Sequence, residues 1–241
     1  MERTAQTDPL RRYATMQSAL GRWRLNMTAR GHRWFWRFHS TSDAVVKRAF
    51  DITASVIFLA VFSPLYLLIA VLIRCEDGGP VFFSQIRVGR NGREFRMYKF
   101  RSMCPDAEAR LREVLAQNQH REGVTFKIKD DPRLTRVGKW LRKCSLDELP
   151  QLWNVLRGDM SLVGPRPPLP REVARYSLAD RRRLAVKPGI TCLWQIGGRS
   201  NIDFSGQVQL DVRYIESADF ATDLKILFKT VPAVVAAKGA C

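Results

Sequence analysis

The chain has 241 residues, of which 40 are Lys or Arg and 23 are Asp or Glu, so it carries a formal net charge of +17. An excess of this size predicts an anionic partner, either nucleic acid or an anionic lipid surface. The cysteines at positions 75, 104, 144, 192 and 241 form no C-x-x-C pair, and no histidine lies at ligand spacing from them. This pattern argues against zinc and against a disulfide framework, and it favours a reducing, cytosolic side.

Residues 1–46 form a basic arm whose arginines are interleaved with aromatic residues, namely Trp23, Trp34, Phe35, Trp36 and Phe38. Aromatic and cationic side chains in such a mixture are typical of the headgroup layer of a membrane. We therefore expect anionic membrane lipids, and no nucleic acid, as the partner. For the part of the arm before residue 30, a disordered segment is an equally good interpretation.

An uncharged stretch of 22 residues runs from Ile52 to Ile73. As a helix it is long enough to cross a hydrocarbon core of roughly 30 Å. The Ser63-Pro64 pair lies at its middle, however, where proline removes a backbone hydrogen bond and bends a helix. The stretch therefore predicts either a spanning helix with a kink or a helix, a break and a second helix.

The charged flanks favour the second interpretation. Basic residues occur on both sides of the stretch, with Lys47 and Arg48 before it and Arg74, Arg87 and Arg90 after it. The positive-inside rule then gives no clear orientation for a spanning helix. We expect residues 47–74 to form a re-entrant membrane hairpin, broken at Ser63 and Pro64, that enters and leaves by the cytoplasmic face; a spanning helix is the alternative.

The remaining residues, 75–241, are predicted to form one compact domain that starts with a β-hairpin. Strands are expected over Val81–Val88 and Arg93–Phe100, joined at Asn91-Gly92, which is a strong hairpin signal. If Arg90 paired with Arg93, Val88 would face Phe95 and Ile86 would face Met97. Lys99 and Arg101 would then lie further along that same face, either beside a site or as a solvated charged end.

Helices are predicted after the hairpin. One starts at Cys104-Pro105, with proline in its first turn, and others are expected near 135–143, around 170–184 and around 219–237. In the 135–143 segment, Val137, Trp140 and Leu141 are surrounded by cations, so this helix is expected either to lie flat on a membrane or to pack on the core. The predicted fold class is an α-rich α+β protein: a re-entrant membrane hairpin, then a compact cytosolic domain with a small β-hairpin and amphipathic interfacial helices.

The most informative segment is 142–168, with the sequence RKCSLDELPQLWNVLRGDMSLVGPRPP. It contains two adjacent carboxylates, Asp147 and Glu148, and a glycine-proline turn that presents Arg166. Two acids held side by side, with cations brought to them by a turn, suit phosphate and metal chemistry. We therefore expect the catalytic residues here.

The start of the helix in this segment has two interpretations. Ser145 with Glu148 three residues later has the form of a capping box. Pro150 favours Asp147 as the N-cap instead, because proline then falls in the first turn, where its missing N–H needs no partner. Leu149, Leu152, Trp153 and Leu156 would bury one face, and the helix would end at Gly158. A carboxylate at the N-terminus of that helix would be stabilised as the anion.

Several segments in a fixed order resemble the bacterial sugar transferase family, the monotopic polyprenyl-phosphate phosphoglycosyl transferases. The resemblance covers residues 45–241. It rests on KRAFDI before the apolar stretch with Ser63-Pro64, and on PVFFSQIRVGRNGREFRMYKFRSM, DPRLTRVGKWLRKCSLDELPQLWNVLRGDMSLVGPRP and KPGITCLWQIGGRS after it.

The resemblance implies transfer of a sugar 1-phosphate from a UDP-sugar to polyprenyl (undecaprenyl) phosphate, with release of UMP, as the first membrane step of polysaccharide or glycoconjugate assembly. Residues 75–241 would be the catalytic domain, on the cytoplasmic face of a bacterial inner membrane. Asp147 would be the nucleophile that forms a covalent phosphosugar intermediate and also a ligand of Mg²⁺, with Glu148 in support. Arg166 would clamp a phosphate. Lys99, Arg101, Arg142 and Arg199 are weaker candidates for the same phosphates.

Two positions depart from the family pattern, Cys192 where glycine is common and Gly197 where serine or asparagine is common. They bear on the choice of nucleotide sugar; the LWQ-x-x-GRS form favours a hexose such as glucose or galactose. A non-catalytic scaffold of a polysaccharide assembly complex and a membrane-tethered nucleic-acid binder are the alternative functions. The second leaves the carboxylate pair and the GPRP turn without a purpose. Assembly into a homo-oligomer is left open.

Overall fold

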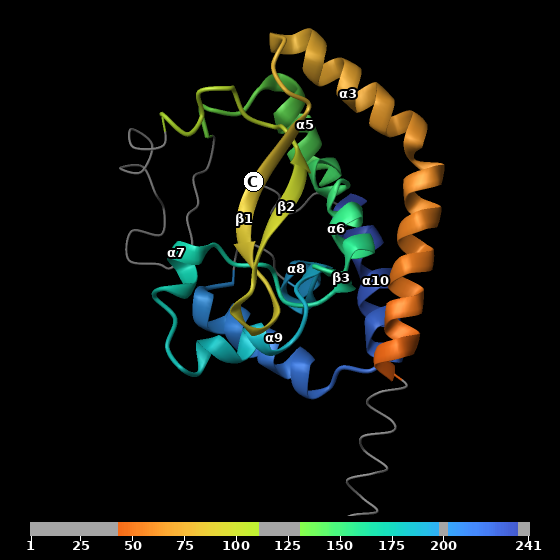
Figure 1. The fold of residues 1–241 in the computed structure, drawn as a ribbon, viewed down its shortest axis with the longest axis vertical. Helices are drawn as coiled ribbons and strands as arrows, with labels where there is room; N and C mark the ends of the chain where they lie inside the picture. Colours follow the sequence, from red (N-terminus) through yellow and green to blue (C-terminus); the bar gives the residue numbers. More distant parts are fainter. Residues whose placement is uncertain (1–42, 111–130, 198–201, 236–241) are drawn as a thin grey trace, which may run out of the picture. The chain divides into compact units, whose positions relative to one another are not determined.

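The computed structural model describes residues 43–110, 131–197 and 202–235 (Figure 1). The chain divides into two units, Met1–Lys47 and Arg48–Cys241. The predicted arm, residues 1–46, lies outside the described residues except for its last four. The second unit is mostly helical and carries two small two-stranded sheets, so the predicted α-rich α+β class is confirmed.

The elements follow one another along the chain in short pieces. After the helix Asp43–Val61 come α3 (Ser63–Asp77), β1 (Phe82–Val88), η1 (Arg90–Gly92), β2 (Glu94–Phe100), α5 (Arg136–Lys143), η2 (Leu146–Glu148), α6 (Gln151–Arg157), β3 (Ser161–Val163), α7 (Pro170–Val173), η3 (Asp180–Ala185), β4 (Gly189–Thr191), α8 (Leu193–Gly197), α9 (Phe204–Glu216) and α10 (Phe220–Val235).

The apolar stretch forms two helices with a break at the predicted place. No single helix within the described ranges is both long and apolar enough to cross a membrane, but Asp43–Val61 and α3, bent by 60° at the break, reach that length and composition together. Pro64 cannot donate to the oxygen of Ala60, and the hydroxyl of Ser63 donates to that oxygen instead, at 2.8 Å. The serine thus replaces the hydrogen bond that the proline removes.

The first helix of this bent pair is tied to the rest of the second unit by polar contacts from its N-terminal turns. Arg48 donates to the main-chain oxygens of Val155 (2.6 Å) and Leu156 (2.8 Å), at the C-terminal end of α6. The buried carboxylate of Asp51 accepts a hydrogen bond from the N–H of Leu162 at 3.1 Å. A cation at a helix C-terminus and a satisfied buried carboxylate are both stabilising. The segment KRAFDI is therefore an anchor between the bent pair and the core.

The β-hairpin forms as predicted, but its register is shifted by one residue. The structure pairs Val88 with Glu94 and Ile86 with Arg96, so the predicted pairs Val88–Phe95 and Ile86–Met97 are wrong. The cause is the turn: Gly89 N–H donates to the oxygen of Arg93 at 2.8 Å, and the chain turns through three residues, 90–92, rather than two. Asn91 and Gly92 take the positive φ angles that this longer turn requires.

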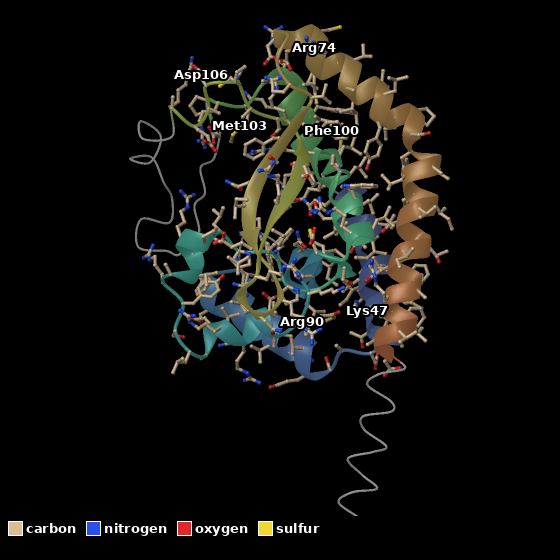
Figure 2. The ribbon with its side chains drawn as sticks, in the orientation of Figure 1. Lys47, Arg74, Arg90, Phe100, Met103 and Asp106 are labelled. Carbon is tan, nitrogen blue, oxygen red and sulfur yellow. The ribbon has the colours of Figure 1, made fainter. Side chains whose placement is uncertain are left out.

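A slip of one residue changes the face on which every side chain of β1 lies. Phe95, Met97 and Lys99 of β2 share their face with Arg87, Gln85 and Phe83, which are their cross-strand partners. Figure 2 shows Arg90 at the turn and Phe100 at the opposite end of the hairpin. The register thus adds a cation, Arg87, to the face that carries Lys99.

Other elements differ from the prediction in length. Residues 105–110 form turns rather than the start of a helix, and residues 111–130 lie outside the described residues. The region around 170–184 contains only the short α7 and η3, because the chain between them passes through turns at 174–175 and 178–179. The predicted helices near 135–143 and 219–237 are confirmed as α5 and α10. Helices α8 and α9 and the parallel pair β3–β4 were not predicted.

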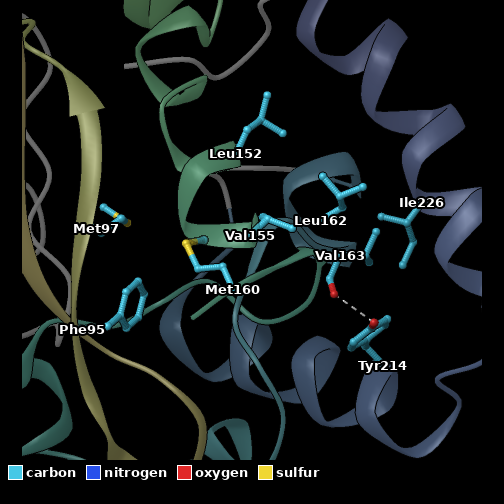
Figure 3. Packing of buried hydrophobic residues seen from close by; sticks show 9 residues of the cluster. All are labelled: Phe95, Met97, Leu152, Val155, Met160, Leu162, Val163, Tyr214 and Ile226. Carbon is cyan, nitrogen blue, oxygen red and sulfur yellow. Dashed lines mark hydrogen bonds between the residues drawn. The ribbon is translucent and has the colours of Figure 1, made fainter. Parts of the chain in front are cut away.

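The larger hydrophobic cluster joins β2, α6, β3, α9 and α10 (Figure 3). Its buried members are Phe95, Met97, Leu152, Val155, Met160, Leu162, Val163, Tyr214 and Ile226. The hydroxyl of Tyr214 lies 3.2 Å from the oxygen of Val163 and 2.7 Å from Asp223 Oδ1, so the one polar atom in this core is satisfied. This cluster joins the hairpin to the helices that follow it.

A second cluster joins the hairpin and α5 to α3, with Ile69, Ile73, Phe100 and Leu141 buried. Leu141 and Val137 of α5 face this cluster, whereas Trp140 is 46% exposed. The prediction that this helix packs on the core is therefore correct for one of its faces. Trp140, on another face, is exposed to solvent.

Asn154 connects α6 to the hairpin. Its side chain is fully buried; Oδ1 accepts from the N–H of Tyr98 at 3.0 Å and Nδ2 donates to the oxygen of Arg96 at 2.8 Å. These are the main-chain groups that a third strand would otherwise pair at the free edge of β2. Asn154 thus holds α6, and the turn before it, against β2.

We predict that Asn154→Ala destabilises the protein by about 2–4 kcal/mol, because it leaves a buried donor and a buried acceptor of β2 without partners. Denaturant unfolding of the detergent-solubilised protein measures the loss. Ser84→Ala, an exposed change on the partner strand, is the control and should cost under about 0.5 kcal/mol. Equal stability of Asn154→Ala and the wild type would show that Asn154 does not hold the two elements together.

Candidate active site

The two adjacent carboxylates lie in a 3₁₀ turn, not at the start of an α-helix. Ser145 takes a left-handed conformation (φ 55°) and makes no capping hydrogen bond, η2 follows, and the N-cap of α6 is Pro150. The prediction of Asp147 as N-cap is therefore wrong, and the capping box is absent too. Pro150 needs no N–H at its position, so the helix starts one turn later than expected.

Helix α6 ends as predicted, at Gly158 in the left-handed conformation (φ 88°). Its predicted apolar face is only partly correct: Leu152 is buried, but Trp153 is 53% exposed. Gln151 and Asn154 take buried positions instead. Polar residues thus occupy the side of α6 that faces the hairpin.

Lys99 of β2 reaches both carboxylates. Its Nζ donates to Glu148 Oε1 at 2.6 Å and lies 3.6 Å from Asp147 Oδ2. The side chain of Asp147 is 8% exposed, whereas that of Glu148 is 28% exposed. One ammonium group therefore holds two adjacent carboxylates, of which Asp147 is the more deeply placed.

The two carboxyl groups differ in acidity. Burial raises the pKa of Asp147, and the charges of Lys99 and Arg142 offset this only in part. Burial also acts against ionisation of Glu148, but the charge and hydrogen bond of Lys99, with Arg166 and Arg87 beyond it, outweigh burial and lower the pKa of Glu148. The expected helix N-terminus does not stabilise Asp147; nearby cations do.

The other predicted cations lie in different places. Arg142 lies near Asp147 and donates through Nε to Ser102 Oγ at 3.0 Å. Arg101 points away from the carboxylates: its Nη1 donates to Asp77 Oδ2 at 2.7 Å and its Nε to the oxygen of Pro80 at 2.6 Å. Arg101 therefore joins the end of α3 to the loop that leads into β1. Arg199 lies outside the described residues.

A small pocket that opens to solvent lies beside Glu148; the space between its lining residues, open solvent included, is about 300 Å³. Its lining contains Arg87, Met97, Lys99, Glu148, Gln151, Arg166, Pro167, Gly189, Ile190 and Gln195. The β-hairpin, the end of η2, the start of α6, the GPRP turn and the β4–α8 segment thus converge on one space. Three cations and one carboxylate line it, so its walls favour an anion.

Arg166 enters this cavity from the GPRP turn. Its Nη1 lies 3.8 Å from Glu172 Oε1, and its side chain is 36% exposed. Glu172 is buried and accepts a hydrogen bond from the N–H of Leu169 at 2.8 Å. The structure therefore brings Arg166 to the same cavity as Lys99 and Glu148, as the sequence predicted.

Arg87 is the site residue that sequence reasoning missed. It is 7% exposed; Nη1 donates to the oxygen of Pro167 at 3.0 Å and Nη2 to Gln85 Oε1 at 2.8 Å. Burial, followed by the charge of Arg166, lowers its pKa to about 9. With the predicted register, Arg87 would lie on the opposite face of the hairpin. The sequence alone indicates it only as one of the basic residues that follow the apolar stretch.

Cys192 contacts a cavity residue. Its buried Sγ donates to Gln195 Oε1 at 3.1 Å, one turn along α8. A glycine at position 192 would lack this contact. The departure from the family pattern therefore changes how one wall of the cavity is held. At Gly197, the second departure, no atom of the described residues lies within 4 Å of the Cβ position.

The carboxylates suit a magnesium ion that takes some of its ligands from a substrate. No group of three or more His, Cys, Asp or Glu residues in the described ranges could hold a metal by itself. Mg²⁺, however, usually binds one or two carboxylates together with substrate phosphates and water. Glu148 lines the cationic cavity and Asp147 is the residue before it, so the two carboxylates fit a magnesium ion that is shared with a phosphorylated substrate.

A model of the bacterial sugar transferase family matches residues 42–237. This chain belongs to that family. It is 50% identical over 205 residues to the galactosyl transferase CpsE of Streptococcus agalactiae, covering 85% of this chain and 45% of that protein. It is 42% identical to the exopolysaccharide production protein ExoY of Sinorhizobium fredii (81% and 88%) and 44% identical to the undecaprenyl-phosphate galactose phosphotransferase of Salmonella typhimurium (83% and 42%). The chain thus spans less than half of two of these relatives and most of the third.

Replacing Lys99 should change the acidity of Glu148. Because Lys99 lowers the pKa of Glu148, Lys99→Met should raise that pKa, so that Glu148 takes up its proton at higher pH than in the wild type. Infrared difference spectra of the protonated carboxyl band, recorded across pH with EDTA present, measure the change, and Glu148→Gln assigns the band. Lys139→Met removes the same charge from an exposed position on α5 and should leave the band unchanged. An identical titration in Lys99→Met and the wild type would contradict the ion pair.

Proposed function

We propose that this protein transfers a sugar 1-phosphate from a UDP-sugar to polyprenyl phosphate and releases UMP. The observation that carries the proposal is the array of Asp147, Glu148 and Lys99 at the edge of a cationic cavity. A deeply placed carboxylate suits a nucleophile, and an anion-binding cavity suits its phosphorylated substrate. The names of the Salmonella and streptococcal relatives, a galactose phosphotransferase and a galactosyl transferase, support the same reaction class.

The reaction has two displacements at one phosphorus atom. A carboxylate oxygen of Asp147 attacks the β-phosphorus of the donor; the bond from this phosphorus to the bridging oxygen breaks, and UMP leaves. An oxygen of polyprenyl phosphate then attacks the same phosphorus and regenerates the carboxylate, leaving a polyprenyl-diphospho-sugar. Lys99 and Arg166 stabilise the charge that develops on the phosphoryl oxygens, and Glu148 orients Asp147 or moves a proton.

Asp147 and Glu148 would hold Mg²⁺ together with oxygens of the diphosphate. The ion supplies further neutralisation of the phosphoryl charge. Lys99 already lies between the two carboxylates, so Asp147 and Glu148 are kept together before any substrate enters. This arrangement supports a role for Glu148 in positioning and a separate, covalent role for Asp147.

The bent helix pair would hold this site at the membrane surface. We propose that Asp43–Val61 and α3 form a re-entrant hairpin in the cytoplasmic leaflet of a bacterial inner membrane. Large apolar side chains exposed on both helices support contact with lipid; they include Val56, Ile57, Phe58, Val61, Leu67, Leu68 and Val71. The phosphate of a polyprenyl lipid lies at headgroup level, which is where the anchor formed by Arg48 and Asp51 would place the cavity.

The transferred sugar is proposed to be a hexose. The LWQ-x-x-GRS segment and the relatives named for galactose support this choice. Gln195 of that segment lines the cavity and is contacted by Cys192. Release of UMP from a panel of UDP-sugars, with undecaprenyl phosphate and Mg²⁺ in detergent, tests both the reaction and the sugar; no UMP from any of them would refute the proposed function.

Asp147→Asn should abolish turnover, with normal expression and membrane extraction, because an amide is not a nucleophile of comparable strength. Glu148→Gln should lower the rate strongly and keep the fold. UMP release measures both. Activity of Asp147→Asn above a few per cent of wild type would rule out the covalent role.

Incubation with UDP-sugar alone should leave a phosphosugar on Asp147, since the first displacement needs no acceptor. Intact mass of the protein detects the adduct, and Asp147→Asn is the control that should not form it. Repeated absence of the adduct from active enzyme, together with sequential kinetics, would favour direct attack by the lipid phosphate.

Both ends of the bent pair should be accessible from the cytoplasmic side only. Cys75 is an exposed cysteine at the end of the pair, and Asp43→Cys adds one at the start. Cysteine labelling in intact and in permeabilised cells measures the accessibility of both positions, and peptide mass identifies which cysteine is labelled. Labelling of position 43 from the periplasm would show a spanning arrangement. Pro64→Leu should straighten the pair and move position 43 across the membrane in part of the molecules.

A further inference from the structure

Arg87 is a buried cation whose charge is poorly compensated. Two of its N–H groups have neutral acceptors, the oxygens of Pro167 and Gln85. Among the described residues no carboxylate forms an ion pair with Arg87, and its buried Nε has no acceptor. A buried charge normally has an ionic partner, because removing the charge from water is costly when no opposite charge replaces the lost hydration. Glu172 and Glu148 act on Arg87 only from a distance, so the guanidinium has room for a directly bound anion.

The position of Arg87 shows where such an anion enters. Arg87 lines the cavity with Arg166 and Lys99, and the charge of Arg166 acts on it directly. It shares the face of the hairpin with Lys99, and Gln85 and Met97 form the cross-strand pair between them. Long side chains that start on either side of this pair reach the same space above Met97.

The carboxylates nearest to Arg87 are bound to other groups. Glu148 is held by Lys99, while Glu172 lies behind Arg166 and also accepts from the N–H of Leu169. Arg171 adds a further positive charge. The cavity wall itself carries three cations against one carboxylate, an excess of two positive charges. A nucleoside diphosphate joined to a sugar has one negative charge on each phosphate, so it matches that excess and offers oxygens on two phosphorus atoms to the two arginines.

We infer that Arg87 is a substrate-binding residue that, with Arg166, holds the diphosphate of the nucleotide donor. The inference rests on the proposed function and adds a residue to it. Arg87 also donates to the oxygen of Pro167, the residue after Arg166, so it fixes the turn that presents its neighbour. Lys99, beside Asp147, is then nearest to the phosphorus that is attacked, and the two arginines hold the phosphate that leaves.

The test compares Arg87→Gln, Arg87→Lys and Arg96→Gln. Arg96 is an exposed arginine on the other face of the same hairpin, so its replacement removes an equal charge without touching the cavity. Binding of UDP, UMP, inorganic phosphate and farnesyl phosphate is measured by calorimetry, and KM and kcat are measured for UDP-galactose and UDP-glucose. Thermal unfolding is recorded with and without UDP.

Arg87→Gln should weaken UDP binding about tenfold to a hundredfold, as expected for loss of a charge-assisted bidentate contact, and should weaken UMP binding as well, because the phosphate of UMP is the one that the two arginines hold. Arg87→Lys should keep the fold and recover only part of the affinity, because an ammonium lacks the fork. Arg96→Gln should bind UDP like the wild type. A role confined to the turn would lower the unfolding temperature but leave the stabilisation by UDP unchanged.

Two results would overturn the inference. Equal affinity for UDP in Arg87→Lys, Arg87→Gln and the wild type would show that Arg87 only supports the turn. A loss confined to farnesyl phosphate would assign Arg87 to the acceptor. Failure of the wild type to bind UDP or release UMP would instead refute the proposed function, and the two failures are thereby distinguished.

Discussion

The arrangement of the site depends on two hydrogen bonds from one buried side chain. Asn154 pairs with the main chain of Tyr98 and Arg96 as a neighbouring strand would, and it does so from a helix. Because α6 starts three residues after Glu148, this contact sets the distance between the carboxylates and β2. Lys99 is the next residue on β2 after Tyr98, and its ammonium meets both acids. The ion pair is therefore a consequence of how α6 is held, and not of the acids alone.

The same helix connects the site to the bent pair. Arg48 binds the carbonyl oxygens at the C-terminal end of α6, while Asn154 holds its side and the carboxylates precede its first turn. Asp51 binds the main chain of β3. This strand pairs with β4, whose first residue, Gly189, lines the cavity. A short helix that is held at each end keeps the carboxylates at a fixed distance from the bent pair. In the proposed reaction this matters, since one substrate enters from water and the other stays in the membrane.

The sequence predicted what depends on residues close together in the chain. The break at Ser63-Pro64, the hairpin turn at Asn91-Gly92, the end of α6 at Gly158 and the arginine of the GPRP turn all follow from local chemistry, and all are present. The roles proposed for Asp147 and Glu148 stay predictions, but the structure does bring them to Lys99 and Arg166. The family resemblance was confirmed as well.

The features that the sequence did not predict depend on a single residue of register or on contacts between distant segments. A three-residue turn instead of a two-residue turn moved Arg87 to the face of Lys99, and no local signal distinguishes these turns when both contain Asn-Gly. The strands β3 and β4 have three residues each, too few for a periodic pattern. Arg101 was expected beside the site because it lies two residues after Lys99 and so on the same face of an extended strand. Asp77 at the end of α3 binds it instead.

The acidity of the two carboxylates follows from this geometry and bears on which of them reacts. Both lose water on burial, but Lys99 makes its short contact with Glu148 and a longer one with Asp147. The ammonium therefore stabilises the anion of Glu148 more, and Asp147 keeps a raised pKa. A carboxylate with a raised pKa is the stronger nucleophile once ionised, because its negative charge is less stabilised by its surroundings.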